Sequence, residues 1–119
     1  AGVILESEAA HYFDLGKKDI SPYMTFVFDS IPEKRDKLTS ALHADTTSRI
    51  QTINEQQNPK LHKLLQTFMQ KTGGPCIINT SFNVQGEPIV CSPEQAVNCF
   101  LNSGIDVLVL GNFIAYKKI

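Results

Sequence analysis

The chain has 119 residues, of which 42% are hydrophobic and 19% are charged. This size and composition suit one globular domain with a modest core and are too small for two domains. Lysine and arginine number 11 against 12 acidic residues, which gives a net charge of -1. That balance excludes the basic surface with which proteins bind nucleic acids. No apolar run approaches the roughly 20 residues that span a bilayer, and residues 1–10 lack the pattern of a signal peptide.

Cys76, Cys91 and Cys99 are odd in number and lack CxxC spacing. A disulfide framework or a zinc site is therefore not expected, and a reducing cytoplasm fits best. We expect Cys76 and Cys99 to be small core residues, and Cys91 has no nearby histidine in the sequence to activate it. The chain begins without methionine and enters an apolar stretch at once, which predicts a piece of a longer protein.

The first half of the chain alternates predicted strands and helices. Apolar and β-branched residues predict strands at residues 3–5 and 23–28, and alternating polarity predicts another at 48–53. Apolar spacing predicts a helix over residues 6–13, and a charged segment with an early proline predicts a short helix over 32–38.

The second half carries clearer start and stop signals. Asn58 and Pro59 predict the start of a helix that reaches residue 71, and an apolar run predicts a fully buried strand at 76–79. Ser92 predicts a second helix, and Gly111 predicts a hairpin between residues 105–110 and 113–116. Together the elements predict an α/β fold, with α+β as the alternative, in one domain over residues 1–119 with a mixed twisted sheet and packed helices.

Two polar clusters carry the candidate chemistry. Asn79, Ser81 and Asn83 follow a predicted buried strand, where ligands of open α/β sheets usually bind; the alternative is a turn that satisfies its own backbone. Arg49 opens a predicted strand among small hydroxyl residues and suits a bidentate grip on phosphate or carboxylate. Its alternative is a surface ion pair with Asp45 or Glu55. His43, just upstream of Arg49, is a candidate to position an acyl oxygen or act as a general base.

These motifs occur together in one known family. NTSFNVQGEPIV (79–90) followed by SPEQAVNCFLNSGIDVLVLGNF (92–113) resembles the C-terminal region of NodU/CmcH-type carbamoyltransferases. HADTTSRIQTI (43–53) resembles that family's block His-x-Asp-Gly-Thr-x-Arg-x-Gln, and residues 3–13 and 21–24 also fit. TSFNVQGEP (80–88) is similar to the T-S-x-N-x-x-G-E-P signature of YrdC-like domains, which bind ATP and form carbamoyl-type adenylates.

The resemblance implies a YrdC-like domain that makes carbamoyl-AMP and pyrophosphate from carbamoyl phosphate and ATP, with Mg²⁺ arriving on the nucleotide. An N-terminal domain of actin-like ATPase type, with its own metal ion, would pass the carbamoyl group to a small hydroxyl acceptor. Arg49 and Ser81 are then the expected catalytic residues, because fixed donors stabilise the anionic charge that moves between phosphates. Asn79, Asn83 and His43 are the further expected binding residues. We expect a cytoplasmic enzyme with no nucleic-acid or membrane partner.

Two departures from the family pattern matter. Thr46 stands where the family usually has glycine. The family's Lys/Arg-rich segment and its F-R-P-F-A-P block lie upstream of residue 1, so we expect this piece alone to be inactive. Two alternative functions stay open: a threonylcarbamoyl-adenylate synthase-like domain for tRNA modification, which usually lacks the HADTTSRIQ block, and a non-catalytic nucleotide-binding or scaffold domain.

Overall fold

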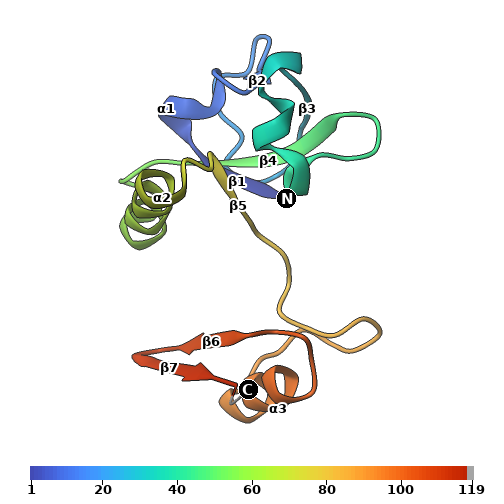
Figure 1. The fold of residues 1–119 in the computed structure, drawn as a ribbon, viewed down its shortest axis with the longest axis vertical. Coiled ribbons are helices and arrows are strands. Elements are labelled where there is room, and N and C mark those ends of the chain that lie inside the picture. Colours follow the sequence, from blue (N-terminus) through green and yellow to red (C-terminus); the bar gives the residue numbers. More distant parts are fainter. Residues whose placement is uncertain (118–119) are drawn as a thin grey trace. The chain divides into compact units, whose positions relative to one another are not determined.

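The computed structural model describes residues 1–117. The contacts divide the chain into two compact units, Ala1–Asn79 (unit 1) and Thr80–Ile119 (unit 2). Each unit has its own secondary structure (Figure 1). The expectation of one domain over residues 1–119 stays a prediction.

A five-stranded mixed sheet forms the centre of unit 1, with the strand order β2-β3-β4-β1-β5. Strand β4 pairs with β1 in parallel, whereas the other neighbouring pairs are antiparallel. The predicted mixed sheet with packed helices is therefore confirmed. The five strands are β1 (Gly2–Leu5), β2 (Phe13–Asp14), β3 (Val27–Ser30), β4 (Thr47–Ile53) and β5 (Cys76–Ile78).

Helical segments cover both faces of this sheet (Figure 1). Helix α2 (Pro59–Thr72) covers one face, where Leu65 packs against Val3, Leu5 and Ile53. The other face carries a larger apolar cluster with Ile4, Phe13, Phe28, Leu38 and Ile50 among its members. The short helix α1 (Glu6–Ala9) and the 3₁₀ segments η1 (Pro32–Lys37) and η2 (Thr39–Ala41) lie along the chain between strands β1 and β4. Burial of each large aliphatic side chain contributes about 1.5–3 kcal/mol.

The alternation of side chains along strand β4 determines which of them point to each face of the sheet. Ser48, Ile50 and Thr52 are fully buried, whereas their neighbours on the strand are more exposed. Alternate side chains of a strand point to opposite faces, and Gln51 pairs with Val3, which packs under α2. Thr47, Arg49 and Gln51 therefore project from the face on which α2 packs.

Several predicted elements of unit 1 are confirmed and others are wrong in part. The strands at 3–5 and 48–53 are present, and the helix predicted over 59–71 is capped by Asn58, whose side chain accepts from Leu61 N at 3.0 Å. The predicted helix over 6–13 ends at Ala9, because Phe13 pairs with Ser30 in the sheet. The predicted helix over 32–38 is a 3₁₀ segment.

Two predicted strands of unit 1 also need correction. The strand predicted over 23–28 begins only at Val27, because residues 21–24 form a separate loop against β4. The strand predicted as fully buried over 76–79 is the edge strand β5, and Ile78 is 47% exposed. An edge strand has a neighbour on one side only, which leaves the backbone groups along its other side unpaired.

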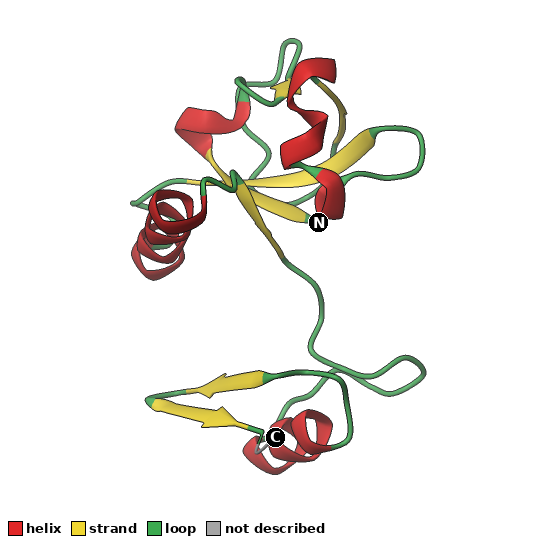
Figure 2. Cartoon of the chain, viewed as in Figure 1, coloured by secondary structure: helices red, strands yellow, loops and turns green. Residues whose placement is uncertain are grey.

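Unit 2 contains helix α3 (Pro93–Leu101) and a hairpin of β6 (Val107–Leu110) and β7 (Phe113–Tyr116), as Figure 2 shows. The predicted cap and turn are both confirmed: Ser92 accepts from Gln95 N at 3.2 Å, and Gly111 has a left-handed φ of 59° between the strands. Cys99 is buried in this unit, as expected, whereas Cys76 of unit 1 is only half-buried. In the part of the chain that the structure describes, no helix is long and apolar enough to cross a membrane.

Thr46 has a φ of 68°, a conformation that glycine adopts without strain and a β-branched residue does not. Left-handed backbone costs a residue with a Cβ about 1–2 kcal/mol, while glycine adds about 0.5–1 kcal/mol of entropy to the unfolded chain. We therefore expect Thr46→Gly to raise the free energy of unfolding by up to about 1 kcal/mol in urea titrations. Thr67→Gly, inside α2, should lower it by roughly 0.5 kcal/mol. Equal losses in both variants would contradict this account.

Candidate functional site

A row of polar side chains lies on the α2 face of unit 1, and we name Thr47, Arg49, Gln51 and Asn79 the polar row. Asn79 follows β5 directly, and its backbone N–H donates to Ala1 O at 2.7 Å, which extends the ladder between β1 and β5. The registers on both sides of β1, continued by one residue, place Arg49 and Asn79 on either side of Ala1. Two strand spacings separate their backbones by about 10 Å.

Gln51 connects β4 to the end of β5. Its Nε2 donates to the carbonyl oxygen of Pro22 at 3.1 Å, and its Oε1 accepts from Nδ2 of Asn79 at 2.9 Å. No role for Gln51 was predicted from the sequence. The signal available was its position two residues after Arg49 in an alternating strand, which places both side chains on one face.

The loop over residues 21–24 is held against β4 by the buried Ser21, which is 1% exposed. Ser21 N donates to Thr52 Oγ1 at 2.8 Å, and Ser21 Oγ donates to the carbonyl oxygen of Ile50 at 3.1 Å. Thr52 N in turn donates to Ser21 O at 3.0 Å. Met24 closes the loop with a left-handed φ of 56°, and its Sδ lies 3.9 Å from Nδ2 of Asn79. The loop therefore lies beside the Gln51–Asn79 pair.

Arg49 is exposed, and its partner across the β3–β4 ladder is the apolar residue Val27. The alternative interpretation paired Arg49 with Asp45 or Glu55, and within residues 1–117 neither ion pair occurs. Asp45 is instead bound by Thr47. The guanidinium thus keeps its planar set of donors, which match phosphate and carboxylate oxygens.

His43 starts a short hydrogen-bond chain at the far end of the polar row. Thr47 Oγ1 donates its single hydrogen to Oδ1 of Asp45 at 2.7 Å, so it must accept from Nδ1 of His43, 3.0 Å away. In the neutral ring this leaves Nε2 as the basic nitrogen. A role for His43 as a general base stays a prediction.

The motif around Ser81 forms a compact turn in unit 2. Nδ2 of Asn83 donates to the carbonyl oxygens of Glu87 at 3.0 Å and Val84 at 3.3 Å, and Ser81 Oγ donates to Oδ1 of Asn83 at 2.5 Å. Gly86 occupies the left-handed position with a φ of 88°. These are the contacts of a turn that satisfies its own backbone, the alternative considered above. Ligand roles for Ser81 and Asn83 stay predictions.

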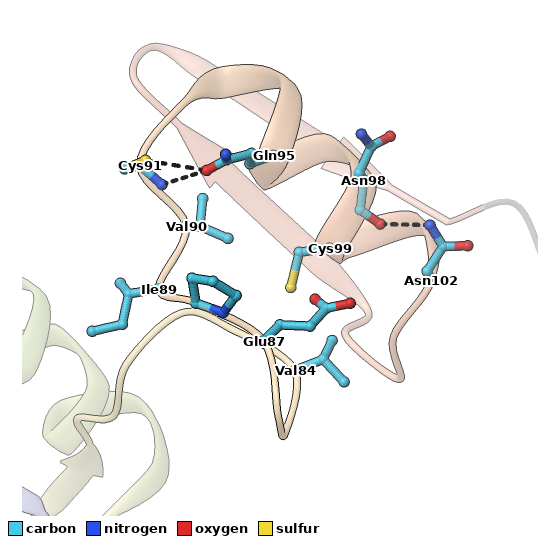
Figure 3. A pocket seen from close by; sticks show the side chains of 10 residues that line it. Val84, Glu87, Ile89, Val90, Cys91, Gln95, Asn98, Cys99 and Asn102 are labelled. Atoms are coloured by element: carbon cyan, nitrogen blue, oxygen red, sulfur yellow. Dashed lines mark hydrogen bonds between the residues drawn. The ribbon is translucent and has the colours of Figure 1, made fainter.

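A pocket of about 440 Å³ in unit 2 was not foreseen from the sequence. Figure 3 shows Cys91 held at its rim, where Oε1 of Gln95 accepts from its backbone N–H at 2.9 Å and lies 3.3 Å from its Sγ. Glu87 is the charged residue among those that line it, so the pocket suits a neutral group better than an anion. The lining residues are Val84, Glu87, Pro88, Ile89, Val90, Cys91, Gln95, Asn98, Cys99 and Asn102.

A second hollow, of about 630 Å³, lies in unit 1 and has Glu6, Asp14 and Asp19 in its lining. Three carboxylates disfavour a phosphate there by like-charge repulsion. Within residues 1–117, no group of three His, Cys, Asp or Glu side chains is arranged to hold a metal ion. Of these places, the polar row is the one whose charge suits an anion.

Comparison with known proteins agrees with the resemblance. The sequence matches the carbamoyltransferase C-terminus family over residues 1–117. The chain belongs to this family. The predicted recognition of a carbamoyltransferase C-terminal region is confirmed.

Three relatives of this carbamoyltransferase C-terminal chain come from bacteria. The chain is 37% identical over 134 residues to an uncharacterized protein of Synechocystis sp., covering 96% of the chain and 22% of that protein. It is 36% identical over 116 residues to nodulation protein NolNO of Sinorhizobium fredii, covering 97% of the chain and 17% of that protein. It is 33% identical over 103 residues to a 3'-hydroxymethylcephem-O-carbamoyltransferase of Amycolatopsis lactamdurans, covering 83% of the chain and 19% of that protein. The chain thus spans about a fifth of the length of these relatives.

The hydroxyl of Thr47 lowers the pKa of the Asp45 carboxyl more than any other contact, followed by the Thr47 backbone N–H. Thr47→Val should therefore raise the pKa of Asp45 toward its ordinary value, while Thr47→Ser should leave it low, as measured by NMR titration of the carboxyl carbon. Because the folded-state pKa lies below the unfolded one, these contacts contribute stability above the ordinary aspartate range, and the contribution is lost as pH falls through the lowered pKa. An unchanged pKa in Thr47→Val would contradict this assignment.

Asn83 holds its turn by two donated hydrogen bonds, so Asn83→Ala should lower the free energy of unfolding by about 1–2 kcal/mol in urea titrations. Ser81→Ala removes one exposed hydroxyl and should cost about 0.5 kcal/mol. Asn98→Ala on the exposed side of α3 is the matched control and should be neutral or slightly stabilising, since alanine is the better helix former. Equal costs for Asn83→Ala and Asn98→Ala would show that the turn does not depend on the Asn83 amide.

Proposed function

We propose that this chain is the part of a carbamoyltransferase that binds carbamoyl phosphate and ATP and forms carbamoyl-adenylate. Membership of the family supports carbamoyl transfer in general. The observation that carries the finer proposal is the polar row, in which the Arg49 guanidinium and the Asn79 amide share one sheet face. Carbamoyl phosphate has two matching parts, a phosphate dianion and a planar amide.

The proposed chemistry moves anionic charge between phosphorus centres. Water releases phosphate and carbamate from carbamoyl phosphate. A carbamate oxygen then forms a bond to the α-phosphorus of ATP, and the bond from that phosphorus to the pyrophosphate oxygen breaks. Arg49 would stabilise the charge that develops on the phosphate oxygens, since a fixed cation in place before the reaction requires little reorganisation.

The proposal assigns the remaining functions to other parts of a longer polypeptide. ATP would arrive with Mg²⁺, which needs few protein ligands of its own. An N-terminal domain of actin-like ATPase type, with its own metal ion, would transfer the carbamoyl group to a small hydroxyl acceptor. Because Arg49 alone does not neutralise the charge of two phosphate-bearing substrates, we expect residues 1–119 by themselves to be inactive.

The test is carbamoyl-phosphate-dependent exchange of labelled pyrophosphate into ATP, measured in the longer protein that contains this chain. Arg49→Ala should reduce the exchange rate by about 10²–10³-fold, as loss of a charge-stabilising donor does elsewhere. Ser81→Ala should also reduce it sharply if that hydroxyl contacts the nucleotide. Lys37→Ala, which removes an exposed cation of η1, is the matched control and should leave the rate unchanged.

Other outcomes of this experiment support the alternatives. Exchange that requires threonine and bicarbonate in place of carbamoyl phosphate would favour the tRNA-modifying class. Nucleotide binding without any exchange would favour a scaffold domain. Undiminished exchange in Arg49→Ala would remove the polar row from the reaction and leave the family membership intact.

A further inference from the structure

We propose that Asn79 presents a hydrogen-bond acceptor to the ligand, and that Gln51 is the positioning residue that fixes this orientation. Asn79 would then recognise the NH₂ end of a carbamoyl group and discriminate against acyl phosphates that lack it. The inference deepens the proposed function and rests on it. It concerns unit 1 alone.

The direction of the hydrogen-bond chain follows from its first member. The carbonyl oxygen of Pro22 can only accept, so Gln51 must turn Nε2 toward it, at 3.1 Å. The other end of the Gln51 amide, Oε1, then faces Asn79 and can also only accept. Asn79 must therefore turn Nδ2 toward it, at 2.9 Å. A reversed Asn79 amide would place two acceptor oxygens against each other.

Both hydrogens of the Asn79 amide are directed into the protein. One is donated to Gln51, and the sulfur of Met24 lies 3.9 Å from the same nitrogen. Oδ1 of Asn79 accepts no hydrogen bond within residues 1–117. The half-buried Asn79 therefore offers a ligand its oxygen rather than its nitrogen.

The hydrogen-bond chain from Pro22 to Asn79 is anchored to the core at its first member. Ser21 precedes Pro22 and is buried, with hydrogen bonds to Ile50 and Thr52 on β4. Gln51 lies between those two residues on the same strand. The Pro22 carbonyl and the Gln51 amide are thus both held by β4, so their relative position does not depend on a mobile segment.

An acceptor at this position distinguishes ligands by the hydrogen-bond donors they carry rather than by their size. The carbamoyl NH₂ donates two hydrogen bonds, whereas the methyl group of acetyl phosphate occupies similar space and donates none. A phosphate oxygen would be repelled by Oδ1, because both are acceptors. The phosphate end would therefore lie toward Arg49, whose backbone is about 10 Å from that of Asn79 across the sheet.

The test compares the dissociation constants of carbamoyl phosphate and acetyl phosphate by titration calorimetry, using the longer protein that contains this chain. The unsubstituted protein should prefer carbamoyl phosphate by about ten- to a hundredfold. Gln51→Met removes both polar ends of the amide at similar volume. It should reduce the preference severalfold by weakening carbamoyl phosphate alone. Asn79→Leu should abolish the preference, and Gln56→Met, in an exposed loop, should leave it unchanged.

A structural role for Gln51 would weaken both ligands equally and would overturn the positioning assignment. A preference that survives Asn79→Leu, or no preference in the unsubstituted protein, would overturn the acceptor assignment. Pyrophosphate exchange measured alongside separates this inference from the proposed function. Preference without exchange would support the subsite and reject adenylate formation, whereas exchange without preference would reject the subsite alone. Binding of neither ligand would reject both.

Discussion

The arrangement of unit 1 depends on strand β4, which is paired on both sides. It pairs with β3 over its first residues and with β1 over its last, so its backbone groups are used in ladders along its length. This double pairing fixes the side-chain alternation that sends Ile50 into the core and Arg49 and Gln51 to the opposite face. A shift of one residue would bury the guanidinium and expose the core. The polar row therefore has the rigidity of the sheet.

Local chemistry allowed part of this fold to be predicted. Asn58 and Ser92 cap their helices as expected, and Gly111 turns the hairpin, because these signals act within a few residues. The helix expected over residues 6–13 is shorter because Phe13 pairs with a strand partner far along the chain. Pairing partners of this kind are not encoded in local spacing, and tertiary packing overrode the helical pattern.

The residues of the candidate site likewise divide into those that the sequence predicted and those that it did not. Arg49 and Asn79 were found because they lie in motifs, whereas the contact between Gln51 and Asn79 joins residues 28 positions apart. That contact needs β5 to lie antiparallel beside β1, and a single sequence gives no register for such a pair. The role of the Pro22 carbonyl was equally unforeseen, since every residue has a backbone carbonyl and the sequence does not show which of them accepts from a side chain.

The buried hydrogen bond between Ser21 and Thr52 has a consequence for how this protein tolerates change. Thr52 is fully buried, yet its hydroxyl accepts from the backbone N–H of Ser21 and so holds the loop beside Asn79. A valine there would match its shape but would leave the buried Ser21 N–H without an acceptor and so release the loop. Engineering that replaces buried hydroxyls with methyl groups would thereby loosen the loop beside Asn79 without altering Asn79 or Gln51 themselves.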